Sequence, residues 1–178
     1  MAKTTWNVDT AHSEVGFTVK HMMISKVKGA FNDFEAVIEA DVEDLTDSKV
    51  EVTIDAASID TRQEGRDDHL RGEDFFDVEK HPKITFVATD IKKKGSNQYD
   101  VTGDLTIKGT TKPVTVDVVY QGQSKDPMSG NIVAGFNAET TINRKDFGLT
   151  WNAPVETGGV LVGEEIKIHS EIEAHKAE

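Results

Sequence analysis

The residues with the richest chemistry in this sequence lie between positions 66 and 82, in the stretch RDDHLRGEDFFDVEKHP. The stretch holds four aspartates, two glutamates, two histidines and two arginines. Carboxylates and imidazoles are the groups that ligate metal ions and that act as general acids and bases. One hypothesis is therefore a metal-assisted hydrolase that uses residues 66–81.

Signals at both ends of a short segment predict a helix in this region. Thr61 and Glu64 have the S/T-x-x-E spacing of a capping box. Gly72 is a typical residue at the end of a helix. We therefore expect a helix over residues 62–71, within a helical insertion of about residues 62–76.

Such a helix separates the ligands that a metal ion would need. Consecutive helical residues point about 100° apart, so Asp67, Asp68 and His69 cannot hold one ion from one helix face. His69 and Glu73 have helical spacing, but Gly72 interrupts the helix between them. We predict no metal site and no catalytic residue here, and the hydrolase remains only the alternative.

The predicted helix instead aligns three cationic side chains, Arg62, Arg66 and His69, at spacings of four and three. Arginine forks bind phosphate or carboxylate groups, which makes these residues candidates for holding the head group of a ligand. The same side chains could form ion pairs with neighbouring acidic residues of the segment, and this alternative stays open.

Asp9, His12 and Ser13 contain the residue types of a catalytic triad. Adjacent residues in an extended chain point to opposite sides, and no nucleophile elbow surrounds Ser13. We expect a structural role for these three residues.

The elements that must position these residues are strands. Apolar and polar residues alternate in eight stretches, which predicts strands with one apolar face each. The stretches cover residues 14–20, 33–42, 50–56, 84–88, 101–107, 114–120, 131–143 and 166–174. We therefore predict an all-β fold with one short helical insertion, in which the strands either stack as a sandwich or close into a barrel; the length of the strands favours an eight-stranded antiparallel barrel.

Long strands and small inward residues favour a bore that is incompletely filled. At ~3.3 Å per residue, the run 131–143 could extend about 40 Å. A narrow apolar bore of this kind suits a chain-like lipid, although phenylalanine side chains could fill it instead. The predicted ligand-binding residues are those with inward apolar side chains: Phe17, Val19, Phe34, Ile38, Ile54, Ile84, Phe86, Leu105, Val116, Val118, Ala134, Phe136, Ala138 and Ile168.

Composition excludes several other functions. The 178 residues are enough for a single domain over residues 1–178, and a formal net charge of −12 disfavours nucleic acid as a partner. The chain has no cysteine, and no run approaches the ~20 apolar residues of a membrane helix. We expect a cytoplasmic protein without stable membrane insertion, whose partner is a small lipid. A homodimer is compatible with these features.

Five segments also resemble the hallmarks of the YceI-like family, in order and across nearly the whole chain. They are WNVDTAHSEVGFTVKH, GAFNDFEAVIEAD, the stretch from Ser58 to Phe86, VTGDLTIKGTTKPV and INRKDFG. The resemblance implies a lipocalin-like barrel whose members are associated with binding polyisoprenoid lipids. It implies a binding protein rather than an enzyme, with a bound isoprenoid-type lipid and no other cofactor.

Overall fold

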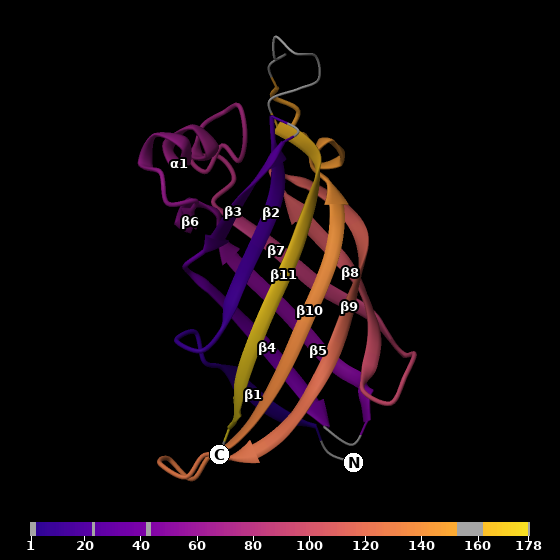
Figure 1. Ribbon diagram of the computed structural model, residues 1–178. Coiled ribbons are helices and arrows are strands. Elements are labelled where there is room, and N and C mark those ends of the chain that lie inside the picture. The colour runs from indigo at the N-terminus through magenta and orange to yellow at the C-terminus, as the bar shows by residue number, and fades with distance from the viewer. Residues whose placement is uncertain (1–2, 23, 42–43, 153–161, 178) are drawn as a thin grey trace.

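The computed structural model describes residues 3–22, 24–41, 44–152 and 162–177, and these residues form an antiparallel β-barrel with one α-helix (Figure 1). In chain order the elements are β1 (Thr4–Val8), β2 (Glu14–His21), β3 (Ser25–Phe31), β4 (Phe34–Asp41), β5 (Asp44–Asp55), η1 (Ala56–Ser58), β6 (Ile59–Asp60), α1 (Glu64–Arg71), β7 (Lys83–Lys93), β8 (Gln98–Ile107), β9 (Thr110–Lys125), β10 (Ile132–Asn143), η2 (Arg144–Phe147) and β11 (Val162–Lys176).

Eight strands close the barrel. Hydrogen-bonded neighbours run in the order β1, β4, β5, β7, β8, β9, β10 and β11, and a β1–β11 ladder joins the two ends of this series. In that ladder Trp6 lies opposite Lys176 and Val8 lies opposite Ala174. The predicted eight-stranded antiparallel barrel is confirmed.

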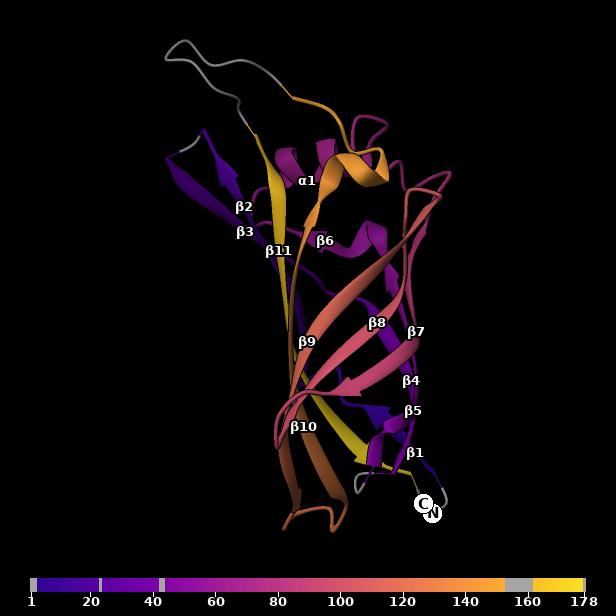
Figure 2. The same ribbon diagram turned by 90° about the vertical axis from the view of Figure 1, so that its right-hand side faces the viewer.

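The membership of the ring differs from the prediction. The predicted strand 14–20 corresponds to β2, which lies outside the closed ring and forms an extension with β3 and β6. Strand β11 pairs with β1 near its end, at Ala174–Lys176, and with β2 at residues 162–171. Figure 2 shows the β2–β3 hairpin diverging from the barrel wall near α1. The short strand β1, which the sequence did not predict, takes the place of β2 in the ring.

The helix is shorter than expected and has a different cap. Gln63, not Thr61, is the N-cap residue, because the Gln63 side chain accepts a hydrogen bond from the Arg66 N–H. Thr61 is buried, and its N–H and hydroxyl both donate to the Asp67 carboxylate. The C-terminal end of the helix is as predicted: the last helical residue is Arg71, and Gly72 is the C-cap.

Two buried apolar clusters occupy the two ends of the barrel. The cluster near α1 and η2 includes Phe31, Ile59, Phe75 and Phe147. The other lies toward the end where the N- and C-termini meet in Figure 1, and its members are Trp6, Ala40, Leu45, Tyr99, Val101, Ala134 and Ala174. The open part of the barrel interior lies between these two clusters. None of the described helices is long and apolar enough to cross a membrane.

Candidate ligand cavity

The barrel encloses an apolar cavity of about 330 Å³. Its wall is built from the inward faces of the strands, since alternate residues of a strand point to the same side of the sheet. Valine, isoleucine, leucine and phenylalanine make up most of this wall. The described polar side chains that line it are Ser48, Tyr99, Thr140, Ser170 and Arg144. Such a cavity can hold an apolar molecule, but it offers few groups for polar chemistry.

One end of the cavity meets the buried cluster near the termini. Leu45 and Tyr99 belong both to that cluster and to the cavity wall, and Trp6 packs in the cluster with 3% of its surface exposed. The Ser48 hydroxyl oxygen is buried there and has no hydrogen-bond partner among the described residues. This end of the bore is therefore a packed floor.

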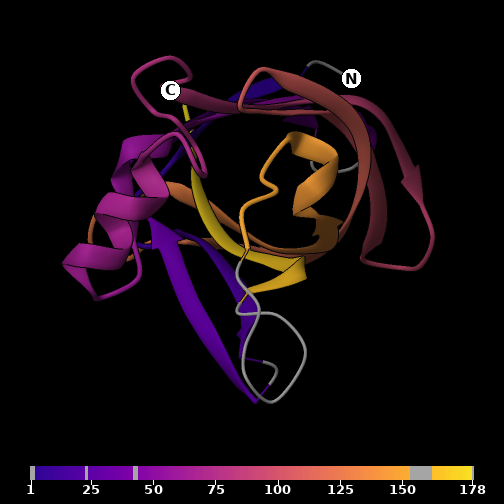
Figure 3. The same cartoon turned by 90° about the horizontal axis from the view of Figure 1, so that it is seen from above.

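Helix α1 and the segment that follows it, up to β7, form part of the opposite end. Leu70, Phe75 and Phe76 line the cavity, and the Phe76 ring meets the Phe31 ring edge-on at a centroid distance of 5.8 Å. Seen from above, η2 lies within the outline of the barrel and α1 lies beside it (Figure 3). The acidic-looking stretch 66–82 thus contributes its apolar side chains to the bore.

Phenylalanine rings fill part of the space beside the small inward-facing residues of the bore. A Cβ added at Gly103 would lie 2.6 Å from the Phe86 Cζ, and one added at Gly29 would lie 2.4 Å from the Phe17 Cζ. These glycines are needed because the rings approach the backbone closely. The rings reduce the bore without closing it, because the cavity remains beside them.

The structure brings thirteen of the fourteen predicted ligand-binding residues to the cavity wall. They are Phe17, Val19, Phe34, Ile38, Ile54, Ile84, Phe86, Leu105, Val116, Val118, Phe136, Ala138 and Ile168. The exception is Ala134, which is fully buried in the floor cluster opposite Ala174 and so has no surface toward the cavity. That ligand contacts these residues stays a prediction.

The three predicted head-group residues do not line the cavity. Arg62 precedes the helix, has a φ of 67° and is exposed, so the expected helical row of three cations is wrong. The Arg66 guanidinium donates to the Thr61 hydroxyl and carbonyl at 2.8 and 2.7 Å. The His69 ring donates to the Asp74 carboxylate at 2.9 Å and packs edge-on against Phe75 and Trp151.

Among the described residues, the cationic side chain that lines the cavity is Arg144, at the start of η2. It is 2% exposed, and its guanidinium donates to the backbone carbonyls of Leu149, Trp151, Val162 and Gly163. Burial lowers the pKa of Arg144. The INRKDF sequence gave no sign of this role, because the acceptors are backbone groups of a later segment.

The carboxylates of residues 66–81 do not converge on a common point. Asp67 accepts hydrogen bonds from Thr61, Asp68 pairs with Arg71 at 3.0 Å, and His69 contacts Asp74. Among the described residues, potential metal ligands gather in a group of three only at Asp9, Glu173 and His175, on another face. In the part of the chain that the structure describes, residues 66–81 therefore contain no group of three potential metal ligands.

Comparisons with known proteins point to one family. The profile of the YceI-like domain matches residues 6–174. A UPF0312 protein of Staphylococcus epidermidis is 45% identical over 170 residues, which are 96% of each chain, and one of Staphylococcus aureus is 43% identical over the same share. These relatives are similar in sequence over almost their full length.

Solved structures agree with this similarity. BcnA from Burkholderia cenocepacia superposes with a TM-score of 0.82 at 31% identity, over 93% of this chain and 98% of that one. The YceI protein of Campylobacter jejuni gives a TM-score of 0.75 at 36% identity over 96% of each chain. A polyisoprenoid binding domain from Saccharophagus degradans, implicated in plant cell wall breakdown, covers 98% of this chain with a TM-score of 0.73. At 13% identity, that last match shows a common fold alone.

Proposed function

The chain belongs to the YceI-like family, and on that basis we propose that it binds a long-chain, isoprenoid-type lipid in the bore of its barrel and sequesters or carries it. The observation that carries this proposal is the apolar cavity enclosed by the closed ring of strands. Burying an apolar chain there removes its surface from water, at roughly 25 cal/mol per Å². The Saccharophagus degradans domain, described as binding polyisoprenoid, has the same fold and is consistent with this class of ligand.

The shape of the bore favours a chain over a compact ligand. The cavity wall runs from Phe31 and Phe76 at the α1 end to Leu45 and Tyr99 at the floor. The floor is packed, so the polar end of a lipid would lie toward α1 and η2. A charged head group must stay near water or meet cations, because burying an unpaired charge is costly.

Solvent extraction of the purified protein, followed by mass spectrometry, tests the proposal. We expect an isoprenoid-type lipid to be extracted, or a protein stripped of lipid to take up added polyprenyl alcohol with saturable, one-to-one binding. Repeated extraction without any lipid, together with no saturable uptake, would rule out the proposed function.

The head group can be examined with a double variant. Arg62 and Arg66 flank the start of the segment whose Leu70, Phe75 and Phe76 line the cavity, so a phosphate emerging at this end would meet their positive charge. We expect Arg62→Ala combined with Arg66→Ala to weaken binding of a prenyl phosphate by up to about tenfold, and to leave its uncharged alcohol nearly unaffected. Added salt should narrow the difference, since exposed charges are screened.

Binding of the two ligands by the double variant also distinguishes the alternatives. An equal loss for phosphate and alcohol would mean that the arginines position the segment, as the Arg66 contacts with Thr61 would allow. Unchanged binding of both would place the head group elsewhere, with Arg144 as the next residue to vary.

A further inference from the structure

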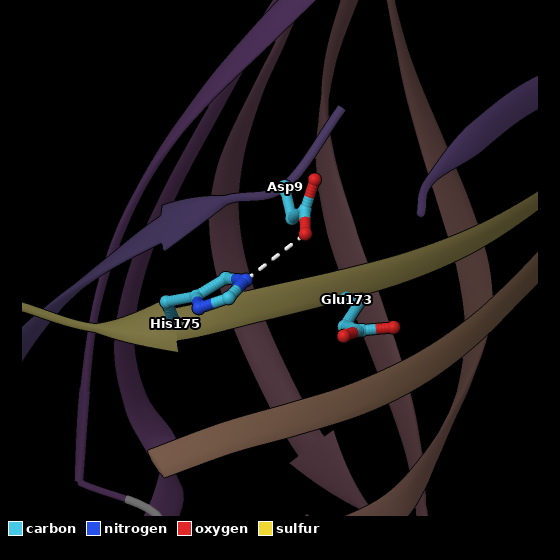
Figure 4. A group of neighbouring side chains, drawn as sticks. All are labelled: Asp9, Glu173 and His175. Atoms are coloured by element: carbon cyan, nitrogen blue, oxygen red, sulfur yellow. Dashed lines mark hydrogen bonds and ion pairs between the residues drawn. The ribbon is translucent and has the colours of Figure 1, made fainter. Parts of the chain in front are cut away.

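A cluster of ionisable side chains lies on the outer face of the barrel, where β1 meets the end of β11 (Figure 4). The Asp9 Oδ2 atom accepts hydrogen bonds from His12 Nδ1 at 2.7 Å and from His175 Nε2 at 3.0 Å. Asp9, Glu173 and His175 each offer one atom that could ligate a metal ion, and these three atoms lie within 4.8 Å of one another. The sequence gives no motif for this group, because 166 positions separate Asp9 from His175.

Strand pairing explains why these residues meet. Ile172 lines the cavity and Ala174 is buried in the floor, so the alternate residues Glu173 and His175 point outward. His175 lies opposite Asn7 in the β1–β11 ladder, which brings the residue following β1 beside it. His175 is thus part of a paired strand.

Backbone contacts hold the group in place. The Asp9 N–H donates to the Glu173 carbonyl at 2.8 Å. The Ser13 hydroxyl accepts from the Glu173 N–H at 2.9 Å and donates to its carbonyl at 3.3 Å. The Ala11 N–H donates to Asp9 Oδ1 at 3.0 Å, which orients the carboxylate toward the two histidines. These contacts are the structural role expected for Asp9 and Ser13. They hold the potential ligand atoms in position before an ion binds.

The surrounding charges favour a cation. The ring N–H groups of His12 and His175 both donate to the Asp9 carboxylate and hold it in place. The Glu173 carboxylate has no hydrogen-bond or ion-pair partner among the described residues, although it lies beside Asp9. Asp126 and Glu171 add negative charge around an open hollow that also contains His12, Glu173 and one cation, Lys125. Of the three residues of the group, Glu173 lines this hollow.

We propose that Asp9, Glu173 and His175 form a binding site for a divalent transition-metal ion, and that Zn²⁺ is the ion this donor set suits best. Imidazole and carboxylate ligands together match Zn²⁺, whereas Mg²⁺ and Ca²⁺ prefer oxygen ligands alone. The ion takes the place of the proton between Asp9 and His175, and water completes its coordination. His12 donates to Asp9 and positions that ligand from outside.

An ion at this position links β1 to β11, the strand pair that closes the barrel. We therefore expect one Zn²⁺ per chain by isothermal titration calorimetry on untagged, metal-free protein, and a rise of about 5 °C in Tm at saturating Zn²⁺. Mg²⁺ should produce neither effect. Glu173→Gln should reduce Zn²⁺ affinity at least tenfold, and so should His175→Ala.

Glu173→Gln is the decisive variant, because the carboxylate that it alters has no partner among the described residues and its loss should not unfold the protein. Glu171→Gln is the matched control, since it removes a carboxylate from the same face of β11, two residues away and outside the group. The control should bind Zn²⁺ like the parent protein. The absence of one-to-one binding, or equal affinity in Glu173→Gln and Glu171→Gln, would overturn the proposal.

Discussion

Replacing Ala138 with tryptophan is expected to reduce lipid uptake at least tenfold. Ala138 lies in the middle of β10, lines the cavity and pairs with Val118 on one side and Ser170 on the other. An indole ring at this position would project into the bore and divide the space that the chain of a lipid must occupy. Saturable uptake of a polyprenyl alcohol, followed by tryptophan fluorescence or by extraction and mass spectrometry, measures the effect.

Glu139→Gln is the matched control for this obstruction, because the next residue of the same strand is exposed and points away from the cavity. Its uptake should equal that of the parent protein. Overpacking costs ~1–3 kcal/mol, so thermal unfolding of both variants must show that they are folded at the assay temperature. A folded Ala138→Trp protein with unchanged affinity would show that the lipid does not occupy the central bore.

Replacing Arg144 with methionine should lower the free energy of unfolding by about 3–5 kcal/mol. The guanidinium donates to four backbone carbonyls; those of Leu149, Trp151 and Gly163 would lose this donor, whereas the Val162 carbonyl would keep its hydrogen bond from the Asn152 side chain. The methionine side chain fills similar space but offers no donor, so the loss should reflect the hydrogen bonds. Urea unfolding followed by circular dichroism measures this difference.

The substitution Lys145→Met, at the neighbouring residue, also removes a positive charge. Comparing it with Arg144→Met distinguishes the effect of the buried hydrogen bonds from that of the lost charge. Lys145 pairs with Glu164 at 2.7 Å, but both side chains are nearly half exposed. Such pairs contribute little, so this variant should lose only a small fraction of the stability lost in Arg144→Met. Similar losses in the two variants would contradict the role assigned to the buried guanidinium.

The barrel could be predicted from the sequence wherever one face of a strand is buried along its whole length. The run 131–143 alternates without interruption, and it forms β10 almost residue for residue. Strands β1 and β3 were missed because their patterns are weak: TTWNV is only five residues long, and SKVKGAF has few apolar residues and lies in the extension. Alternation therefore identified the walls of the barrel but not the strand that closes it.

Side-chain roles that depend on distant parts of the chain could not be predicted. Thr61 and Glu64 have the spacing of a capping box, yet Asp67 binds Thr61 and leaves Gln63 as the cap. The phase of β10 correctly turned Ala134 inward, but only the packing against Ala174 shows that it belongs to the floor. The periodicity of a strand predicts which face a side chain lies on. Which residues that side chain contacts depends on the tertiary structure.

The β1–β11 ladder has a consequence for the order of folding events. Trp6 lies opposite Lys176, so the barrel can close only after nearly the whole chain has left the ribosome. Contacts between residues so far apart raise the contact order, and proteins dominated by such contacts fold in milliseconds to seconds. During synthesis the seven ring strands made before β11 form an open sheet whose two edges, β1 and β10, are unpaired, the form most exposed to aggregation. Substitutions in β1 should therefore affect the yield of folded protein more than the size of this five-residue strand suggests.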